Sequence, residues 1–180
     1  TTAEVGDNNK IRENVTINRG TAAKGKTCVG SGNLLMESVH VAHDAFVGND
    51  CIIGNGTKLA GEIIIDDHAI ISANVLMHQF CRVGGYTMVG GGTRFSQDIP
   101  PYTICAREPV AYCGLNLVGL RRRGFSNELI ENIHNTYRII YQGGVPLNEA
   151  LQKVREEVPA SPEINYIIEF IENSKRGFVH

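Results

Sequence analysis

The chain has 180 residues, of which 20 are glycine, and a formal net charge of −2 at pH 7. This length is typical of one domain, or of one domain with a small appendage. The near-neutral charge argues against a nucleic-acid scaffold, which usually carries a basic excess. No apolar run is long enough to span a membrane.

The N-terminus and the cysteines indicate the cellular compartment in which we expect the protein. The first ten residues, TTAEVGDNNK, contain neither the basic nor the apolar segment of a signal peptide. The five cysteines are odd in number and form no Cys-x-x-Cys pair, which argues against a disulfide framework or a zinc ribbon. We therefore expect a cytoplasmic protein. Because the chain starts at Thr1, already inside a pattern and without Met, we also expect a fragment of a longer protein.

Apolar residues recur every six positions through the first half of the chain. They are Val5, Ile11, Ile17, Ala23, Val29, Leu35, Val41, Val47, Ile53, Leu59, Ile65, Ile71, Met77, Val83, Val89 and Phe95. A second inward position, four residues after each of these, is usually small, as at Thr21, Ala45 and Thr57. Neither a helix nor a simple strand has a period of six. The pattern predicts a mainly β protein built on a left-handed parallel β-helix, with three hexapeptides per triangular coil.

The composition changes after the hexapeptide repeats. We expect the β-helix to occupy residues 1–105, with its N-terminal coils missing, and a C-terminal segment with a helical subdomain to occupy residues 106–180. Gly20–Thr27 is predicted to form a loop that leaves one coil, and Pro100-Pro101 marks the exit from the solenoid. Capping and stop signals predict three helices, which run from Ser126 to Gly143, over Leu147–Val158, and onward from Ser161.

One corner of the predicted solenoid carries functional groups instead of plain turn formers. His43 occupies this corner, Gly61 follows it one coil later and Gln79 two coils later, so the three should form a row. A histidine can take a proton from an attacking hydroxyl, and the adjacent Asp44 can orient its imidazole. Gly61 would present a free backbone N–H to a developing oxyanion. The alternative is a solvated corner histidine.

Two further histidines and a basic run are candidate binding groups. His40 and His78 raise the possibility of zinc, since some β-helix proteins are zinc carbonic anhydrases with three histidine ligands. The chain lacks the His-x4-His spacing of those enzymes, so we expect no metal. Arg121-Arg122-Arg123-Gly124, placed just before the first predicted helix, could bind a diphosphate, or could be a solvated or subunit-contact cluster.

Ordered motifs over essentially the whole chain resemble one family. They are His40-Val-Ala-His43-Asp44, Leu59-Ala60-Gly61, His78-Gln79-Phe80 and Gly119-Leu-Arg-Arg-Arg-Gly-Phe125, with residues 6–13 and Asn18-Arg19-Gly20-Thr21 also fitting. This order is similar to that of the acyl-carrier-protein-dependent UDP-N-acetylglucosamine O-acyltransferases of lipid A biosynthesis, in the hexapeptide-repeat acyltransferase superfamily.

The resemblance implies a reaction, partners and residue roles. A homotrimer with sites between neighbouring β-helices would transfer a 3-hydroxyacyl group from acyl carrier protein to the 3-hydroxyl of UDP-N-acetylglucosamine. His43 would be the general base, helped by Asp44, with the Gly61 amide as oxyanion donor. The implied substrate contacts are His40, His78, Gln79, Asn116, Arg122 and Arg123, and Gly91 would measure the acyl chain. No cofactor, nucleic acid or stable membrane insertion is expected.

The chain departs from the family pattern in two places. Glu62 follows Gly61 where better-known members have His, which changes one sugar or phosphate contact. The first coils of the family, with a loop that grips the sugar, are absent. The alternative functions are an N-acyltransferase of the same pathway, a γ-type carbonic anhydrase, and a trimeric β-helix that no longer catalyses.

Overall fold

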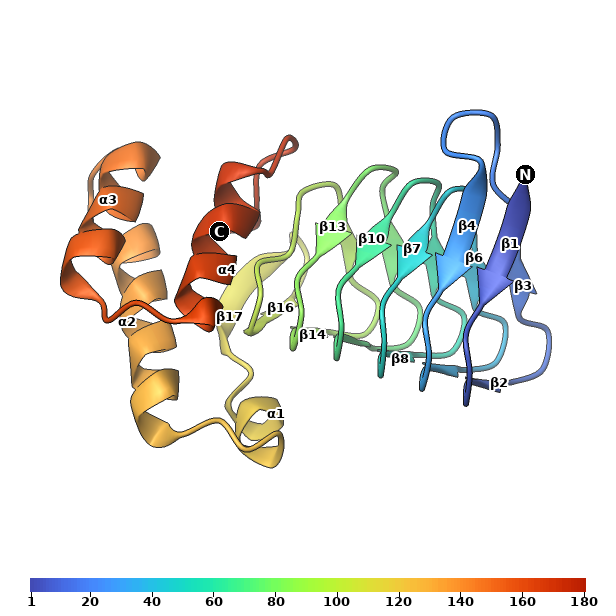
Figure 1. The fold of residues 1–180 in the computed structure, drawn as a ribbon, viewed down its shortest axis with the longest axis horizontal. Coiled ribbons are helices and arrows are strands. Elements are labelled where there is room, and N and C mark those ends of the chain that lie inside the picture. The colour runs from blue at the N-terminus through green and yellow to red at the C-terminus, as the bar shows by residue number, and fades with distance from the viewer.

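Short parallel strands build the first half of the molecule. The computed structural model describes residues 1–180, and the predicted left-handed parallel β-helix is confirmed, with strands stacked into three sheets (Figure 1). The A sheet contains β1 (Thr2–Val5), β4 (Lys26–Val29), β7 (Phe46–Val47), β10 (Ile64–Ile65) and β13 (Arg82–Val83). The B sheet contains β2 (Lys10–Ile11), β5 (Leu34–Leu35), β8 (Ile52–Ile53), β11 (Ile70–Ile71), β14 (Met88–Val89), β16 (Thr103–Ala106) and β17 (Ala111–Leu115). The C sheet contains β3 (Thr16–Ile17), β6 (His40–Val41), β9 (Lys58–Leu59), β12 (Leu76–Met77) and β15 (Arg94–Phe95).

The six-residue column forms the core of the solenoid. Its members from Leu35 to Ile71 are fully buried, and they belong to a cluster of 22 buried residues. Cys51 and Cys81 lie in the same core, as small apolar residues would. Burial raises the pKa of the Cys51 thiol to about 12 and that of the Cys81 thiol to about 11, so neither is a reactive thiolate at neutral pH.

Not every position of the six-residue count is inward. Val5 and Ile11 are each 45% exposed, because the first coil has a neighbour on only one side. Ala23 and Thr21 are exposed in the loop between β3 and β4, so their predicted inward placement is wrong. Six extra residues lie in this loop: β3 and β6 pair 24 residues apart, as Thr16 with His40, whereas later strands pair 18 apart, as Ile64 with Arg82.

The solenoid continues beyond the last residue of the count, Phe95. β16 extends the B sheet in parallel with β14, and β17 adds an antiparallel strand. Met88 pairs with Ile104, a separation two residues shorter than that between earlier coils. The six-residue phase is therefore lost between Phe95, which still pairs in register with Met77, and Ile99, which already bridges Val83 ahead of the two prolines. The B sheet itself continues.

Four helices cover the end of the solenoid that is remote from the N-terminus (Figure 1). They are α1 (Leu117–Arg122), α2 (Asn127–Gln142), α3 (Leu147–Glu157) and α4 (Pro162–Glu172). The last three were predicted, and the Ser126 and Ser161 side chains cap α2 and α4 by accepting from backbone N–H groups. The short α1 was not predicted; the arginine run lies at its C-terminal end, not before the first helix. No helix combines the length and apolar character needed to cross a membrane.

Candidate active site

His43, Gly61 and Gln79 lie in one row along the edge where the C sheet turns into the A sheet. The row follows from strand register, since Val41 pairs with Leu59 and Leu59 with Met77. Backbone hydrogen bonds continue the ladder around the corner, where Glu62 N–H donates to the His43 carbonyl at 3.0 Å. The sequence-predicted row is therefore present in the structure.

His43 and Asp44 form a hydrogen-bonded pair at this corner. The Nδ1 of His43 lies 2.9 Å from Oδ2 of Asp44, whose side chain is fully buried while that of His43 is 43% exposed. Asp44 adopts φ +60°, a left-handed conformation that Asp tolerates better than most residues. Because an ionised carboxylate only accepts, Nδ1 carries the ring proton and Nε2 is left free to accept one.

Thr21 also holds Asp44, and sequence reasoning gave it no such role. The Thr21 N–H donates to Oδ1 at 2.9 Å and its hydroxyl to Oδ2 at 2.5 Å. The Thr21 hydrogen bond is the main reason that the pKa of Asp44 falls to about 2, with the hydrogen bond from His43 contributing further. No periodic signal reveals this contact, because it joins an irregular loop to a corner one coil away.

Gly61 brings its backbone against the His43 ring. A Cβ at Gly61 would lie 2.6 Å from both Cε1 and Nε2 of His43, so only glycine leaves the ring in this position. The Gly61 N–H donates to no acceptor within the chain. A free proton acceptor and a free amide donor thus lie side by side, the arrangement required to deprotonate a nucleophile and bind an oxyanion.

The loop between β3 and β4 forms a wall beside His43. Together they border an open pocket of about 450 Å³, lined by Thr1, Asn18, Arg19, Gly20, Thr21, Ala22 and His43. Lys24 of the same loop lies 3.5 Å from the carboxylate of Glu62. The residue that departs from the family pattern therefore pairs with the loop.

Comparisons with known proteins agree with this geometry. A family model described as UDP N-acetylglucosamine O-acyltransferase, domain 2, matches residues 98–179. The structure of LpxA, a UDP-N-acetylglucosamine acyltransferase from Bacteroides fragilis, is 74% identical with a TM-score of 0.97, over 99% of this chain and 70% of that one. LpxA from Acinetobacter baumannii is 37% identical with a TM-score of 0.95, over 99% of this chain and 70% of that one. The Arabidopsis UDP-N-acetylglucosamine acyltransferase is 33% identical with a TM-score of 0.94, over 99% of this chain and 66% of that one.

The chain belongs to the UDP-N-acetylglucosamine acyltransferase family. It is therefore an acyltransferase, and the resemblance inferred from the ordered motifs is confirmed. Members of this family share the β-helix and the helical end over nearly the whole of this chain.

The remaining residues predicted from the family pattern lie on other parts of the solenoid. His40 on β6 contacts the Thr16 hydroxyl through Nδ1 at 2.7 Å. His78 follows β12, and its Nδ1–H donates to the Gln79 carbonyl at 2.9 Å. Both histidines therefore keep Nε2 free of hydrogen bonds within the chain. His40 begins β6, level with Lys58 and Leu76, whereas His78 follows β12 and adjoins Gln79 of the His43 row.

Asn116 and the two predicted arginines lie near a different edge, where the A sheet turns into the B sheet. Asn116 is buried and caps α1, accepting from Gly119 N–H at 3.2 Å and donating to the Tyr86 carbonyl at 3.0 Å. Arg122 ends α1 and Arg123 follows it. Arg123 lines a hollow with Lys10, Asp50, Ile52 and their neighbours, a set that does not include His43.

Gly91 lies on the third edge, between the B and C sheets. A Cβ there would make ordinary contacts, at 3.5 Å from the Ala73 carbonyl oxygen and 3.8 Å from Cβ of Ser72. One chain therefore does not bring Gly91, Arg123 and His43 together.

The outer face of the B sheet is apolar, and sequence reasoning missed it. Its outward side chains are Leu34, Ile52, Ile70, Met88 and Ile104, of which Ile52 and Met88 are each 37% exposed. The signal was present in the sequence, since each of these strands carries two adjacent apolar residues instead of one. A row of partly exposed apolar side chains such as this, from β5 to β16, is typical of a contact surface.

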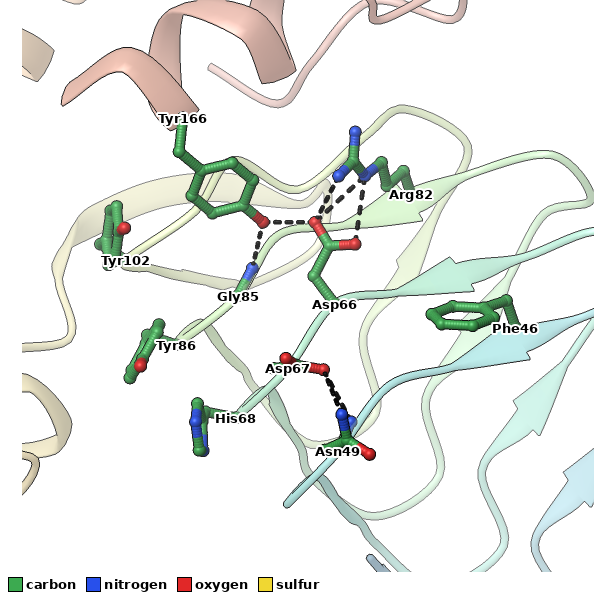
Figure 2. Close-up of a pocket in the computed structure, with 10 residues that line it drawn as sticks. All are labelled: Phe46, Asn49, Asp66, Asp67, His68, Arg82, Gly85, Tyr86, Tyr102 and Tyr166. Atoms are coloured by element: carbon green, nitrogen blue, oxygen red, sulfur yellow. Dashed lines mark hydrogen bonds and ion pairs between the residues drawn. The ribbon is translucent and has the colours of Figure 1, made fainter. Parts of the chain in front are cut away.

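A second pocket lies beneath α4, away from the predicted residues (Figure 2). It measures about 490 Å³ and is lined by Phe46, Asn49, Asp66, Asp67, His68, Arg82, Gly85, Tyr86, Tyr102 and Tyr166. The polar groups of its floor bind one another: Arg82 pairs with Asp66 at 2.8 Å, and Tyr166 donates to Asp66 while accepting from Gly85 N–H at 2.8 Å. These contacts dock α4 on the solenoid.

Metal binding was one alternative for the histidines. No three His, Cys, Asp or Glu side chains of one chain are grouped as metal ligands. His68 also has no such role within the chain: it stacks on Tyr86 at a centroid distance of 4.7 Å, and burial lowers its pKa.

Proposed function

We propose that the chain transfers a 3-hydroxyacyl group from acyl carrier protein to the 3-hydroxyl of UDP-N-acetylglucosamine, the first step of lipid A biosynthesis. The observation that carries this proposal is the His43–Asp44 pair packed on the free amide of Gly61. Membership of the UDP-N-acetylglucosamine acyltransferase family supports the acceptor substrate. The carrier-protein donor and the 3-hydroxyacyl group follow from the resemblance to the family, and the mechanism is inferred from the chemistry of the corner.

The reaction follows from the free groups of this corner. Nε2 of His43 takes the proton of the sugar hydroxyl as its oxygen attacks the thioester carbonyl. The carbonyl oxygen becomes an oxyanion and accepts from the Gly61 N–H, while Asp44 stabilises the imidazolium. Collapse of the tetrahedral intermediate breaks the C–S bond, and the thiolate takes the proton back from His43. The products are the acylated sugar nucleotide and the free carrier thiol.

Substrate binding would involve residues on all three edges. We assign His40, His78 and Gln79 to contacts near the reacting groups, Asn116, Arg122 and Arg123 to the nucleotide or carrier side, and Gly91 to the end of the acyl chain. Guanidinium groups suit phosphate oxygens, and an absent side chain at Gly91 leaves room for a long chain. All five cysteines are free, which supports the proposed reducing, cytoplasmic setting.

A homotrimer would bring these edges together. The apolar outer face of the B sheet supports such an assembly, because it offers each copy a surface to bury against its neighbour. The wide spacing of His43, Arg123 and Gly91 within one chain supports sites between copies.

The direct test compares the wild-type chain with His43→Ala for acyl transfer from 3-hydroxyacyl carrier protein to UDP-N-acetylglucosamine. Loss of a general base should lower kcat by about 10²- to 10⁴-fold. His134→Ala serves as a matched control on the outer side of α2 and should leave the rate unchanged. An unchanged rate in His43→Ala, or stoichiometric zinc in the purified protein, would contradict the proposal.

A further inference from the structure

The loop between β3 and β4 is an enlarged corner of the C-to-A edge. It spans residues 18–25 and projects from the solenoid next to the first coils (Figure 1). Later corners on this edge need only the four residues between successive strands, as between Val41 and Phe46. The extra residues carry Thr21 to the His43 corner of the next coil.

Thr21 occupies both oxygens of Asp44. Its amide donates to Oδ1 at 2.9 Å and its hydroxyl to Oδ2 at 2.5 Å, the oxygen that also faces His43 Nδ1 at 2.9 Å. From the other side, the Asp44 N–H donates to the Thr27 hydroxyl at 2.8 Å. His43 is the only titratable group paired with this carboxylate. Both carboxylate oxygens of Asp44 thus accept hydrogen bonds from Thr21, which lies outside the His43–Asp44 pair.

We propose that Thr21 is a positioning residue, which acts through Asp44 to fix the orientation of the His43 imidazole. A carboxylate held only by His43 could rotate about its Cβ–Cγ bond and carry the ring with it. Two donors from Thr21, on a buried anion, remove that freedom, and hydrogen bonds to charged groups are the strong ones. The inference rests on the proposed function, because it assumes that His43 is the base.

A second contact keeps the loop in place. Lys24 lies 3.5 Å from Glu62, whose side chain is only 18% exposed. Glu62 directly follows Gly61, so the ion pair joins the loop to the next rung of the catalytic row. An ion pair with a partly exposed lysine adds little stability, so this contact supports the position of the loop only weakly and the hydrogen bonds from Thr21 to Asp44 remain the main attachment.

The test removes the Thr21 hydroxyl without changing the shape of the side chain. Thr21→Val should lower kcat by roughly tenfold, because a hydrogen bond to a charged group is lost, while KM for both substrates stays near its wild-type value. Thr21→Ser keeps the hydroxyl and should restore most of kcat. Equal losses in the two variants, or a loss confined to KM, would overturn the proposal.

A double-mutant cycle separates action through Asp44 from a general role of the loop. In an Asp44→Asn background, Thr21→Val should cost little further activity, since the carboxylate it orients is gone. Full additivity of the two losses would contradict the proposal.

A titration that needs no activity distinguishes this inference from the proposed function. The carboxyl carbon of Asp44, followed by NMR in ¹³C-labelled protein, should report a pKa of about 2 in the wild-type chain and a higher pKa in Thr21→Val. An unmoved pKa would overturn the role of Thr21. Absence of acyl transfer by the wild-type chain would instead overturn the proposed function.

Discussion

The two members of the His43–Asp44 pair lie in opposite environments. The imidazole is partly exposed, so a substrate hydroxyl can reach Nε2, whereas the Asp44 carboxylate is fully shielded and accepts three hydrogen bonds. Those hydrogen bonds outweigh the cost of burial and lower the pKa of Asp44. Asp44 therefore stays ionised at neutral pH and favours the imidazole tautomer that acts as a base.

Gly61→Ala tests this geometry at the scale of one methyl group. The new Cβ would lie 2.6 Å from the His43 ring. Because a side chain moves more readily than the backbone, we expect the His43 ring to be displaced. We expect kcat to fall by about 100-fold, since a displacement near 1 Å costs this much, with the free energy of unfolding changed by less than about 1 kcal/mol. Enzyme assays and urea denaturation measure the two quantities.

The amide donor survives this substitution, so the loss should come through His43 alone. Adding Gly61→Ala to His43→Ala should therefore lower the rate no further. A further large loss in that background, or a wild-type rate in the single variant, would show that the close packing of Gly61 on His43 is unimportant.

Among the elements, α4 makes its hydrogen-bonded contact with the solenoid through the Tyr166 hydroxyl. Tyr166 accepts from Gly85 N–H and donates to Asp66, which Arg82 also holds, and Arg82 lies over the Phe170 ring at 4.8 Å. Figure 2 shows the hydrogen bonds and the ion pair among Tyr166, Gly85, Asp66 and Arg82. The contacts connect the helical end to coils that continue into the catalytic row.

Tyr166→Phe should lower the free energy of unfolding by about 1–3 kcal/mol, because it leaves the Gly85 N–H without a partner and removes one of the hydrogen bonds that Asp66 accepts. Tyr86→Phe is the matched control, because the Tyr86 hydroxyl makes no hydrogen bond within the chain. Removing this hydroxyl should therefore leave the free energy of unfolding nearly unchanged. Equal midpoints of denaturation in the two variants would contradict the proposed docking role.

The sequence predicts the elements well where apolar residues recur at a fixed spacing or where a capping residue marks a helix start. The six-residue count identifies the β-helix, and Ser126 and Ser161 correctly mark two helix starts. The same count misplaces Ala23, because the inserted loop is six residues long and keeps the phase by coincidence. It also misses β16, because the spacing between coils shortens by two residues between Phe95 and Ile99, just before the two prolines. Irregular spacing leaves no period to detect.

The candidate site shows the same division. Strand register follows from the repeat, so the sequence alone brings Gly61 and Gln79 into line with His43. The contact of Thr21 with Asp44 depends on the course of an irregular loop, which no spacing rule describes. The outward apolar residues of the B sheet are present in the sequence as pairs of adjacent apolar residues. They form one surface only because the strands stack in register.

At the scale of the whole molecule, a single chain spreads the proposed site residues over three edges. His43 lies at the edge between the C and A sheets, Arg123 near the edge between the A and B sheets, and Gly91 at the third. Between them, the B sheet presents an apolar outer face. The proposed function therefore predicts that a complete site forms between neighbouring copies, with the base from one and the arginines from another.

Mixed assemblies test this central claim most directly. The measurement is acyl transfer by complexes co-expressed from differently tagged His43→Ala and Arg122→Ala/Arg123→Ala chains, each nearly inactive alone. If the site lies between copies, random mixing gives about one quarter of the sites an intact base and intact arginines, so activity should recover to about a quarter of the wild-type rate. Activity no higher than the mean of the two separate variants would contradict the account.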